Sequence, residues 1–209
     1  MLNLEDYITA HTTAPDDYLA RLYRATHLHL LYPRMASGPV QGQLLKMLMQ
    51  LARPRLVVEI GTYSGYSALS MAAGMEKGGR VLTFEVNDEQ AAFTRPWLEH
   101  SPYDAKVEMY VGDVFELLPA ICPAIDVAFV DANKREYTAY YDLLLPFMHS
   151  GSLLLADNTL WDGHVTDPHY DRDAQTVGIR IFNDHVAADP RVEQVILPER
   201  DGLTLIRVK

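Results

Sequence analysis

Short apolar runs alternate with longer segments in which apolar residues recur every three or four positions, from about residue 56 onward. The runs are rich in β-branched residues and predict strands, whereas the helical spacing of the longer segments predicts helices between them. Strands are expected at 56–60, 80–85, 107–111, 125–130 and 151–156, and helices at 66–73, 88–98, 114–118 and 135–147. This alternation predicts an α/β fold with a doubly wound, mostly parallel sheet.

The segment before this alternation is helical in pattern. Residues 16–31 and 41–51 predict two helices, and about residues 1–52 are expected to cover the ligand-binding edge of a single domain spanning 1–209. Four apolar residues of this region have no obvious place in the core of the sheet, which predicts a two-fold homodimer built partly from it. They are Leu19, Leu22, Leu30 and Tyr32.

The last third of the chain departs from the simple alternation. Residues 158–175 contain four Asp residues, one Gly and one Pro and predict a long loop, which in a compact domain is usually functional or mobile. A helix is expected at 177–187, followed by a hairpin of strands at 192–197 and 203–208. The hairpin implies one antiparallel strand in the otherwise parallel sheet.

A glycine turn follows the first predicted strand. Glu59 precedes Gly61 by two residues, and Gly65 follows at the start of a helix pattern. A strand, a tight turn and a helix N-terminus form the usual nucleotide site of open α/β sheets. The dinucleotide fingerprint needs G-x-G-x-x-G, which argues against a nicotinamide dehydrogenase. An acid before the turn repels a pyrophosphate and suits a ligand with a positive end or hydroxyl donors, such as S-adenosylmethionine (SAM).

A second acid ends the next predicted strand. Glu85 occupies the position at which nucleoside sites place a carboxylate that accepts hydrogen bonds from ribose hydroxyls. An exposed acid at a strand end is also common, but its pairing with the glycine turn favours ribose binding.

Oxygen donors follow the fourth and fifth predicted strands. Asp131 comes directly after one, and Asp157 and Asn158 after the other. If the two strands are neighbours, their ends lie about 4.8 Å apart, and oxygen-only donors select a hard cation such as Mg²⁺. Lys134 lies three residues after Asp131. A nearby cation and a positive helix end would lower its pKa and make it a general base.

Other side chains are weaker candidates. Trp161 either packs or walls a planar substrate, His164 and His169 are not expected to be ligands, and Cys122 is expected to be a buried thiol. Three tyrosines share a helix face and are expected to pack rather than to form a site: Tyr137, Tyr140 and Tyr141.

The composition restricts the class of partner. A net charge of −10 and a pI of about 5.2 argue against general binding of nucleic acid or anionic membranes. A single cysteine excludes an internal disulfide framework and fits a reducing compartment. No apolar run approaches the roughly 20 residues of a membrane helix, and the first ten residues lack the basic start of a signal peptide. A cytoplasmic protein is expected.

Three segments together resemble the cation-dependent O-methyltransferases of the caffeoyl-CoA and catechol type: 59–67, 130–134 and 157–161. The likeness runs from about Met35 to the C-terminus. It implies a seven-stranded class I methyltransferase fold of the Rossmann-like kind, usually a homodimer. It also implies SAM and a divalent metal as cofactors, with magnesium first and manganese or calcium as alternatives.

The resemblance also assigns roles by position. It places metal binding on Asp131, Asp157 and Asn158, and the catalytic base on Lys134 beside Asp131. Its cofactor contacts are Ser37, Glu59, Gly61, Thr62, Ser67, Glu85, Asp113, Val114 and Asp131. One departure is Asn133, which stands where many relatives have a second acid.

The expected activity is methyl transfer from SAM to a hydroxyl of a small aromatic diol whose two oxygens chelate the metal. Two alternatives remain. A methyltransferase of this fold could act on a modified tRNA base, for which the acidic balance is unfavourable despite a possible basic patch at Arg21, Arg24, Arg34, Arg53 and Arg55. The second alternative is a nucleoside-binding protein without catalysis. The presence of Asp131, Lys134, Asp157 and Asn158 argues against this alternative.

Overall fold

The computed structural model describes residues 3–121 and 124–209, so Cys122 lies outside the described residues. Seven strands follow the order β3-β2-β1-β4-β5-β7-β6. β7 runs antiparallel to both β5 and β6, and the pairs β1–β4, β2–β3 and β4–β5 are parallel. The predicted mixed sheet is therefore confirmed. The strands are β1 (Leu56–Ile60), β2 (Arg80–Glu85), β3 (Lys106–Val111), β4 (Ile125–Val130), β5 (Met148–Asp157), β6 (Val192–Leu197) and β7 (Leu203–Val208).

Helices connect these strands much as the apolar spacing predicts. They are α1 (Leu4–Ala10), α2 (Asp17–His29), α3 (Gly38–Ala52), α4 (Tyr66–Ala72), α5 (Asp88–Glu99), α6 (Val114–Ile121), α7 (Tyr137–Leu144) and α8 (Ala174–Ala188). α1 was not predicted from the apolar spacing. It begins where the Asn3 side chain accepts a hydrogen bond from the Asp6 amide at 2.8 Å, and none of its residues is buried.

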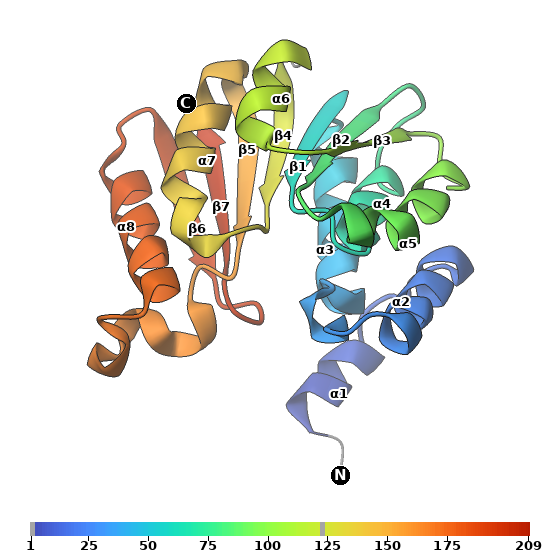
Figure 1. The fold of residues 1–209 in the computed structure, drawn as a ribbon, viewed down its shortest axis with the longest axis horizontal. Coiled ribbons are helices and arrows are strands. Elements are labelled where there is room, and N and C mark those ends of the chain that lie inside the picture. The colour runs from blue at the N-terminus through green and yellow to red at the C-terminus, as the bar shows by residue number, and fades with distance from the viewer. Residues whose placement is uncertain (1–2, 122–123) are drawn as a thin grey trace. The chain divides into compact units, whose positions relative to one another are not determined.

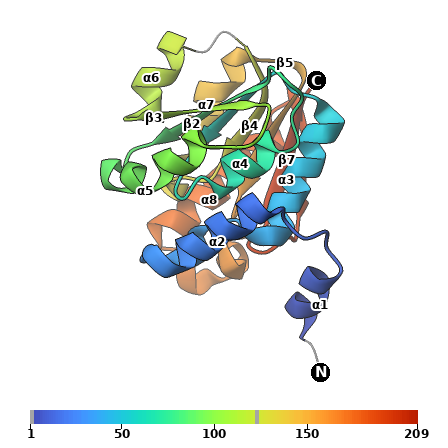
Figure 2. The same ribbon diagram turned by 90° about the vertical axis from the view of Figure 1, so that its right-hand side faces the viewer.

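The chain divides into two compact units, of which the first comprises residues 1–55 and 62–113. In this unit α3 packs on α4 so closely that a Cβ on Gly42 would lie 2.8 Å from the Tyr66 ring and the Ser70 hydroxyl. Figures 1 and 2 show α1 projecting from the rest of the unit. Leu19 and Leu22 are buried, so their expected place on a dimer surface is wrong, whereas Tyr32 is 64% exposed.

The second unit comprises residues 56–61 and 114–209. Here α7 and α8 lie side by side over the strands (Figure 1). Phe182 of α8 is buried and meets the rings of Tyr137 and Tyr141 edge-on, with centroids 5.5 and 6.3 Å away. These aromatic contacts join the two helices that follow the candidate site residues along the chain.

The predicted loop at 158–175 contains two short 3₁₀ helices, Trp161–Thr166 and Pro168–Tyr170. Arg180 of α8 holds it. Its guanidinium donates to the carbonyls of His164, Val165 and Asp167 at 2.8–2.9 Å and to the Asp171 carboxylate at 2.6 Å. The Arg180 guanidinium therefore connects this segment to α8 through four hydrogen bonds. Within the described ranges, no helix has the length and apolar character to cross a membrane.

Candidate active site

The glycine turn of the second unit brings two strand ends together. β1 is buried along its whole length, and the Ile60 carbonyl accepts a hydrogen bond from the Asp131 amide at 2.9 Å. Gly61 has a φ of +98°, and a Cβ there would overlap the Asp131 carbonyl oxygen. Any other residue would be strained in this conformation and would push Asp131 away. The glycine is therefore required for the position of Asp131.

Glu85 of the first unit is a fixed hydrogen-bond acceptor. Its Oε2 accepts from the Tyr63 amide and its Oε1 from the Asn87 amide, each at 2.9 Å. Each carboxylate oxygen has capacity for a further hydrogen bond, and the side chain is only partly exposed. In the same unit, the hydroxyls of Thr62 and Thr83 form a buried hydrogen bond at 2.6 Å. This arrangement suits a ligand that donates two hydroxyl groups.

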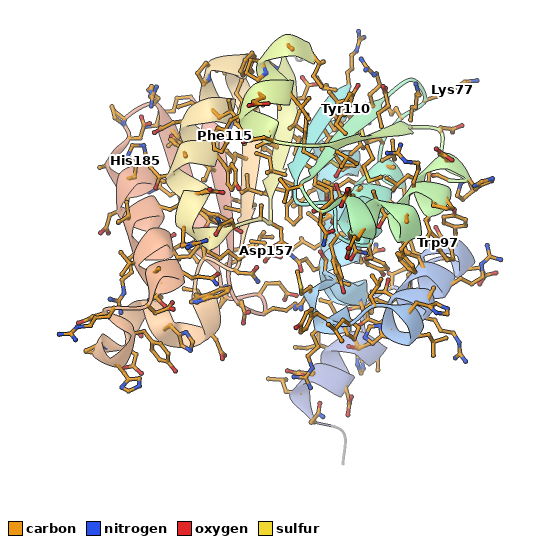
Figure 3. The ribbon with its side chains drawn as sticks, viewed as in Figure 1. Lys77, Trp97, Tyr110, Phe115, Asp157 and His185 are labelled. Carbon is orange, nitrogen blue, oxygen red and sulfur yellow. The ribbon has the colours of Figure 1, made fainter. Side chains whose placement is uncertain are left out.

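Two carboxylates lie at adjacent strand ends in the second unit. Val130 of β4 is the register partner of Ala156 of β5, so Asp131 and Asp157 follow paired residues. Figure 3 shows Asp157 where β5 ends and the chain enters the loop toward α8. The side chain of Asp131 is 23% exposed, and Asp157 is 4% exposed. The expectation that strands four and five are neighbours is confirmed.

Asn158, the third predicted oxygen donor, has a left-handed backbone conformation. The φ of Asn158 is +59°, and its backbone N–H donates a hydrogen bond to Asp157 Oδ1 at 2.8 Å. No cluster of three His, Cys, Asp or Glu side chains suited to a metal occurs among the described residues. A cation at these strand ends would therefore need the side-chain oxygen of Asn158 beside the two aspartates. Two carboxylates and an amide oxygen are the hard donors that Mg²⁺, Mn²⁺ and Ca²⁺ take, so the donor set fits.

Lys134 pairs directly with Asp131. Its side chain is 7% exposed, and Nζ donates to Asp131 Oδ1 and to the Tyr137 hydroxyl, each at 2.8 Å. Burial disfavours the charged amine, but Asp131 and Tyr137 outweigh it and raise the pKa of Lys134 above its ordinary value. The predicted lowering of this pKa requires a bound cation and stays a prediction. Lys134 is an ammonium here.

Known proteins match this chain over nearly its full length. The sequence profile of a family described as O-methyltransferase matches residues 9–209. A catechol O-methyltransferase of Niastella koreensis is 32% identical over 85% of this chain and 84% of its own. A caffeoyl-CoA O-methyltransferase of Mesembryanthemum crystallinum is 33% identical over 83% of this chain and 72% of its own. The crystal structure of the O-methyltransferase TomG from Streptomyces achromogenes, in complex with SAM, superposes with a TM-score of 0.89 at 28% identity and full coverage of both chains.

The chain belongs to this O-methyltransferase family. The methyltransferase is an SAM-dependent enzyme of the caffeoyl-CoA and catechol type. Membership in this enzyme family contradicts the alternative hypothesis of a nucleoside-binding protein without catalysis.

The cofactor residues predicted for the methyltransferase differ in burial. Asp113 is exposed, whereas the others are buried or partly buried. The first unit carries Ser37, Thr62, Ser67, Glu85 and Asp113, and the second carries Glu59, Gly61, Val114 and Asp131.

One contact of Lys134 was not predicted from the sequence. Tyr137 was expected only to pack, yet its hydroxyl contacts Lys134 and the carbonyl of Asp157. The available signal was its position three residues after Lys134, which places the two side chains on the same face of a helical turn. Tyr140 and Tyr141 bond instead to Glu136 and Asp189, away from Lys134. His164 stacks on Tyr170 with centroids 3.5 Å apart.

Proposed function

We propose that this enzyme transfers a methyl group from SAM to one hydroxyl of a small catechol-like diol, with a divalent cation held by Asp131, Asp157 and Asn158. One observation carries the proposal. The β4–β5 register sets two aspartates at adjacent strand ends, and a buried lysine pairs with one of them.

The cation supplies Lewis-acid chemistry when bound, because it lowers the pKa of a coordinated hydroxyl and orients it. The residues of the chain do the rest. Asp131 and Asp157 would provide two negative charges to hold the cation, and Asn158 would add a neutral oxygen. A vicinal diol could complete this set with two oxygens, whereas a monophenol offers only one. The arrangement therefore favours catechols over simple phenols.

Lys134 is the proposed acceptor of the hydroxyl proton. It must first lose its own proton, which Asp131 holds in place in the metal-free protein. Engagement of Asp131 with a cation would remove much of this stabilisation and bring the pKa of Lys134 down. The Trp161 ring lies 5.8 Å from Nζ and offers an apolar, planar surface to an aromatic acceptor.

Glu85 and the glycine turn are the proposed cofactor determinants. Glu85 would accept hydrogen bonds from the two ribose hydroxyls of SAM, as its free acceptor capacity allows. A homodimer is also proposed, because several apolar side chains of the N-terminal region are exposed. Leu28, Leu31 and Tyr32 are 64%, 82% and 64% exposed.

A methyl-transfer assay with isotopically labelled SAM tests the function. The acceptors are a catechol, the matching monophenol, caffeoyl-CoA and bulk tRNA, each with and without a chelator. We expect transfer to the catechol, loss with chelator and recovery with excess Mg²⁺. Chelator-resistant transfer, or transfer to tRNA alone, would overturn the proposal.

A further inference from the structure

We propose that Tyr137 is a positioning residue, whose hydroxyl, together with the close approach of Gly178, aims the Lys134 side chain at the metal-ligand strand ends. This inference rests on the proposed function. Tyr137 is neither a proposed metal ligand nor a proposed cofactor contact. Its proposed role is to hold the Lys134 side chain in position against the ends of β4 and β5.

The Tyr137 hydroxyl connects three groups. It accepts a hydrogen bond from Lys134 Nζ at 2.8 Å and donates to the Asp157 carbonyl at 2.9 Å. The Val130 carbonyl lies 3.3 Å away, within reach of the same hydroxyl. Val130 ends β4 and Asp157 ends β5. One hydroxyl therefore links Lys134 to the ends of both strands that carry the proposed ligands.

The hydroxyl is itself immobile. Tyr137 is 1% exposed, and its ring meets Phe182 edge-on and Tyr140 at 6.4 Å. Lys134 Nζ lies 5.0 Å from the centre of the same ring. Because an ammonium has three N–H groups, the bonds to Asp131 and Tyr137 define the direction of the third. That direction would vary if the flexible lysine had only Asp131 as a partner.

Gly178 of α8 supports the backbone at Lys134. A Cβ on Gly178 would lie 2.6 Å from the Lys134 carbonyl oxygen and 2.7 Å from the Arg135 Cα. The helix can therefore rest against Lys134 and Arg135 only because residue 178 has no side chain. Gly178 fixes the main chain, and the Tyr137 hydroxyl fixes the side chain.

Tyr141 provides a matched control on the same helix. It is also 1% exposed and also contacts Phe182, and its hydroxyl donates to Asp189 at 2.9 Å in a part-buried hydrogen bond. Tyr141→Phe therefore removes a hydroxyl from the same aromatic cluster without touching Lys134.

The test compares the full-length wild type, Tyr137→Phe and Tyr141→Phe. Three quantities are measured: Mn²⁺ binding from the electron paramagnetic resonance signal of the free ion, S-adenosylhomocysteine affinity by calorimetry, and kcat and KM for a catechol. We expect Tyr137→Phe to lower kcat or Mn²⁺ affinity about 10- to 100-fold, as loss of outer-shell partners does. Its S-adenosylhomocysteine affinity should stay within about twofold, and Tyr141→Phe should leave all three near wild type.

Equal effects of the two Phe variants, or a Tyr137→Phe enzyme with wild-type kcat and Mn²⁺ affinity, would overturn the inference. If Tyr137→Phe does not fold, Gly178→Ala carries the test, and wild-type kcat in that variant would overturn it. Failure of the proposed function is distinguishable. A wild type that transfers methyl groups without a metal contradicts that function, while the kcat comparison between the Phe variants still tests Tyr137.

Discussion

Val130 of β4 pairs in parallel register with Ala156 of β5, and each is followed directly by an aspartate. Neighbouring strands lie about 4.8 Å apart, so the register alone brings Asp131 and Asp157 together. The Tyr137 hydroxyl and Lys134 then connect the same two strand ends. This juxtaposition of two carboxylates and one buried ammonium is the chemical centre of the second unit.

Loss of the Glu85 carboxylate should weaken cofactor binding. Glu85→Ala removes the acceptor proposed for the ribose hydroxyls, so SAM affinity should fall by about 1–3 kcal/mol, or roughly 5- to 150-fold in Kd. Calorimetry measures the change. Glu99→Ala, which alters an exposed acid at the end of α5, is the control and should bind normally. Unchanged affinity in Glu85→Ala would refute the ribose assignment.

The regular elements were predictable because burial leaves a periodic signal. β1, β2, β4, β6 and β7 begin and end where the apolar runs predict. α1 left no such signal, since its apolar residues face solvent and none of them is buried. The predicted loop at 158–175 was only partly right, because two 3₁₀ helices lie within it and α8 begins at Ala174; its contacts with the distant Arg180 left no signal in the sequence.

The juxtaposition of Asp131 and Asp157 was predictable, because neighbouring parallel strands end at one edge of a sheet. The direct pairing of Lys134 with Asp131 at 2.8 Å was not predicted, because sequence spacing does not reveal such a contact. Tyr137 was missed for a related reason. A tyrosine on a helix face usually packs, and only its hydroxyl contacts distinguish it from Tyr141.

Assembly should depend on the exposed apolar residues of the N-terminal region. We expect the wild type to be a dimer at micromolar concentration by multi-angle light scattering. Leu31→Asp should shift it toward monomer without loss of folding, since Leu31 is 82% exposed. Ile181→Asp places the same charge on an apolar residue of α8 that is 55% exposed, and it should leave the dimer intact. A monomeric wild type would count against the dimer.

Stability should carry a pH dependence from His149. Its ring bonds with the Ser150 carbonyl and then with Asp126, whose Oδ1 is 3.0 Å away, and both raise its pKa above the ordinary 6.5. A raised folded pKa means that the stabilisation is fully present below about pH 6.5 and is lost as pH rises through the folded value. The free energy of unfolding in urea should therefore separate wild type from His149→Gln more at pH 5.5 than at pH 8.5. A separation that is constant or larger at pH 8.5 would contradict this assignment.

The most direct test of the central claim is the metal dependence of methyl transfer in Asp157→Ala. The substitution removes one of two charged ligands, and Mg²⁺ dehydrates reluctantly, so the remaining donors should hold it poorly. Catechol methylation should collapse in this variant and in chelator-treated wild type. S-adenosylhomocysteine affinity should largely survive, and Asp184→Ala, at an exposed position of α8, should keep full activity. Catechol methylation at the full wild-type rate, either in Asp157→Ala or after chelation, would contradict the proposed metal chemistry.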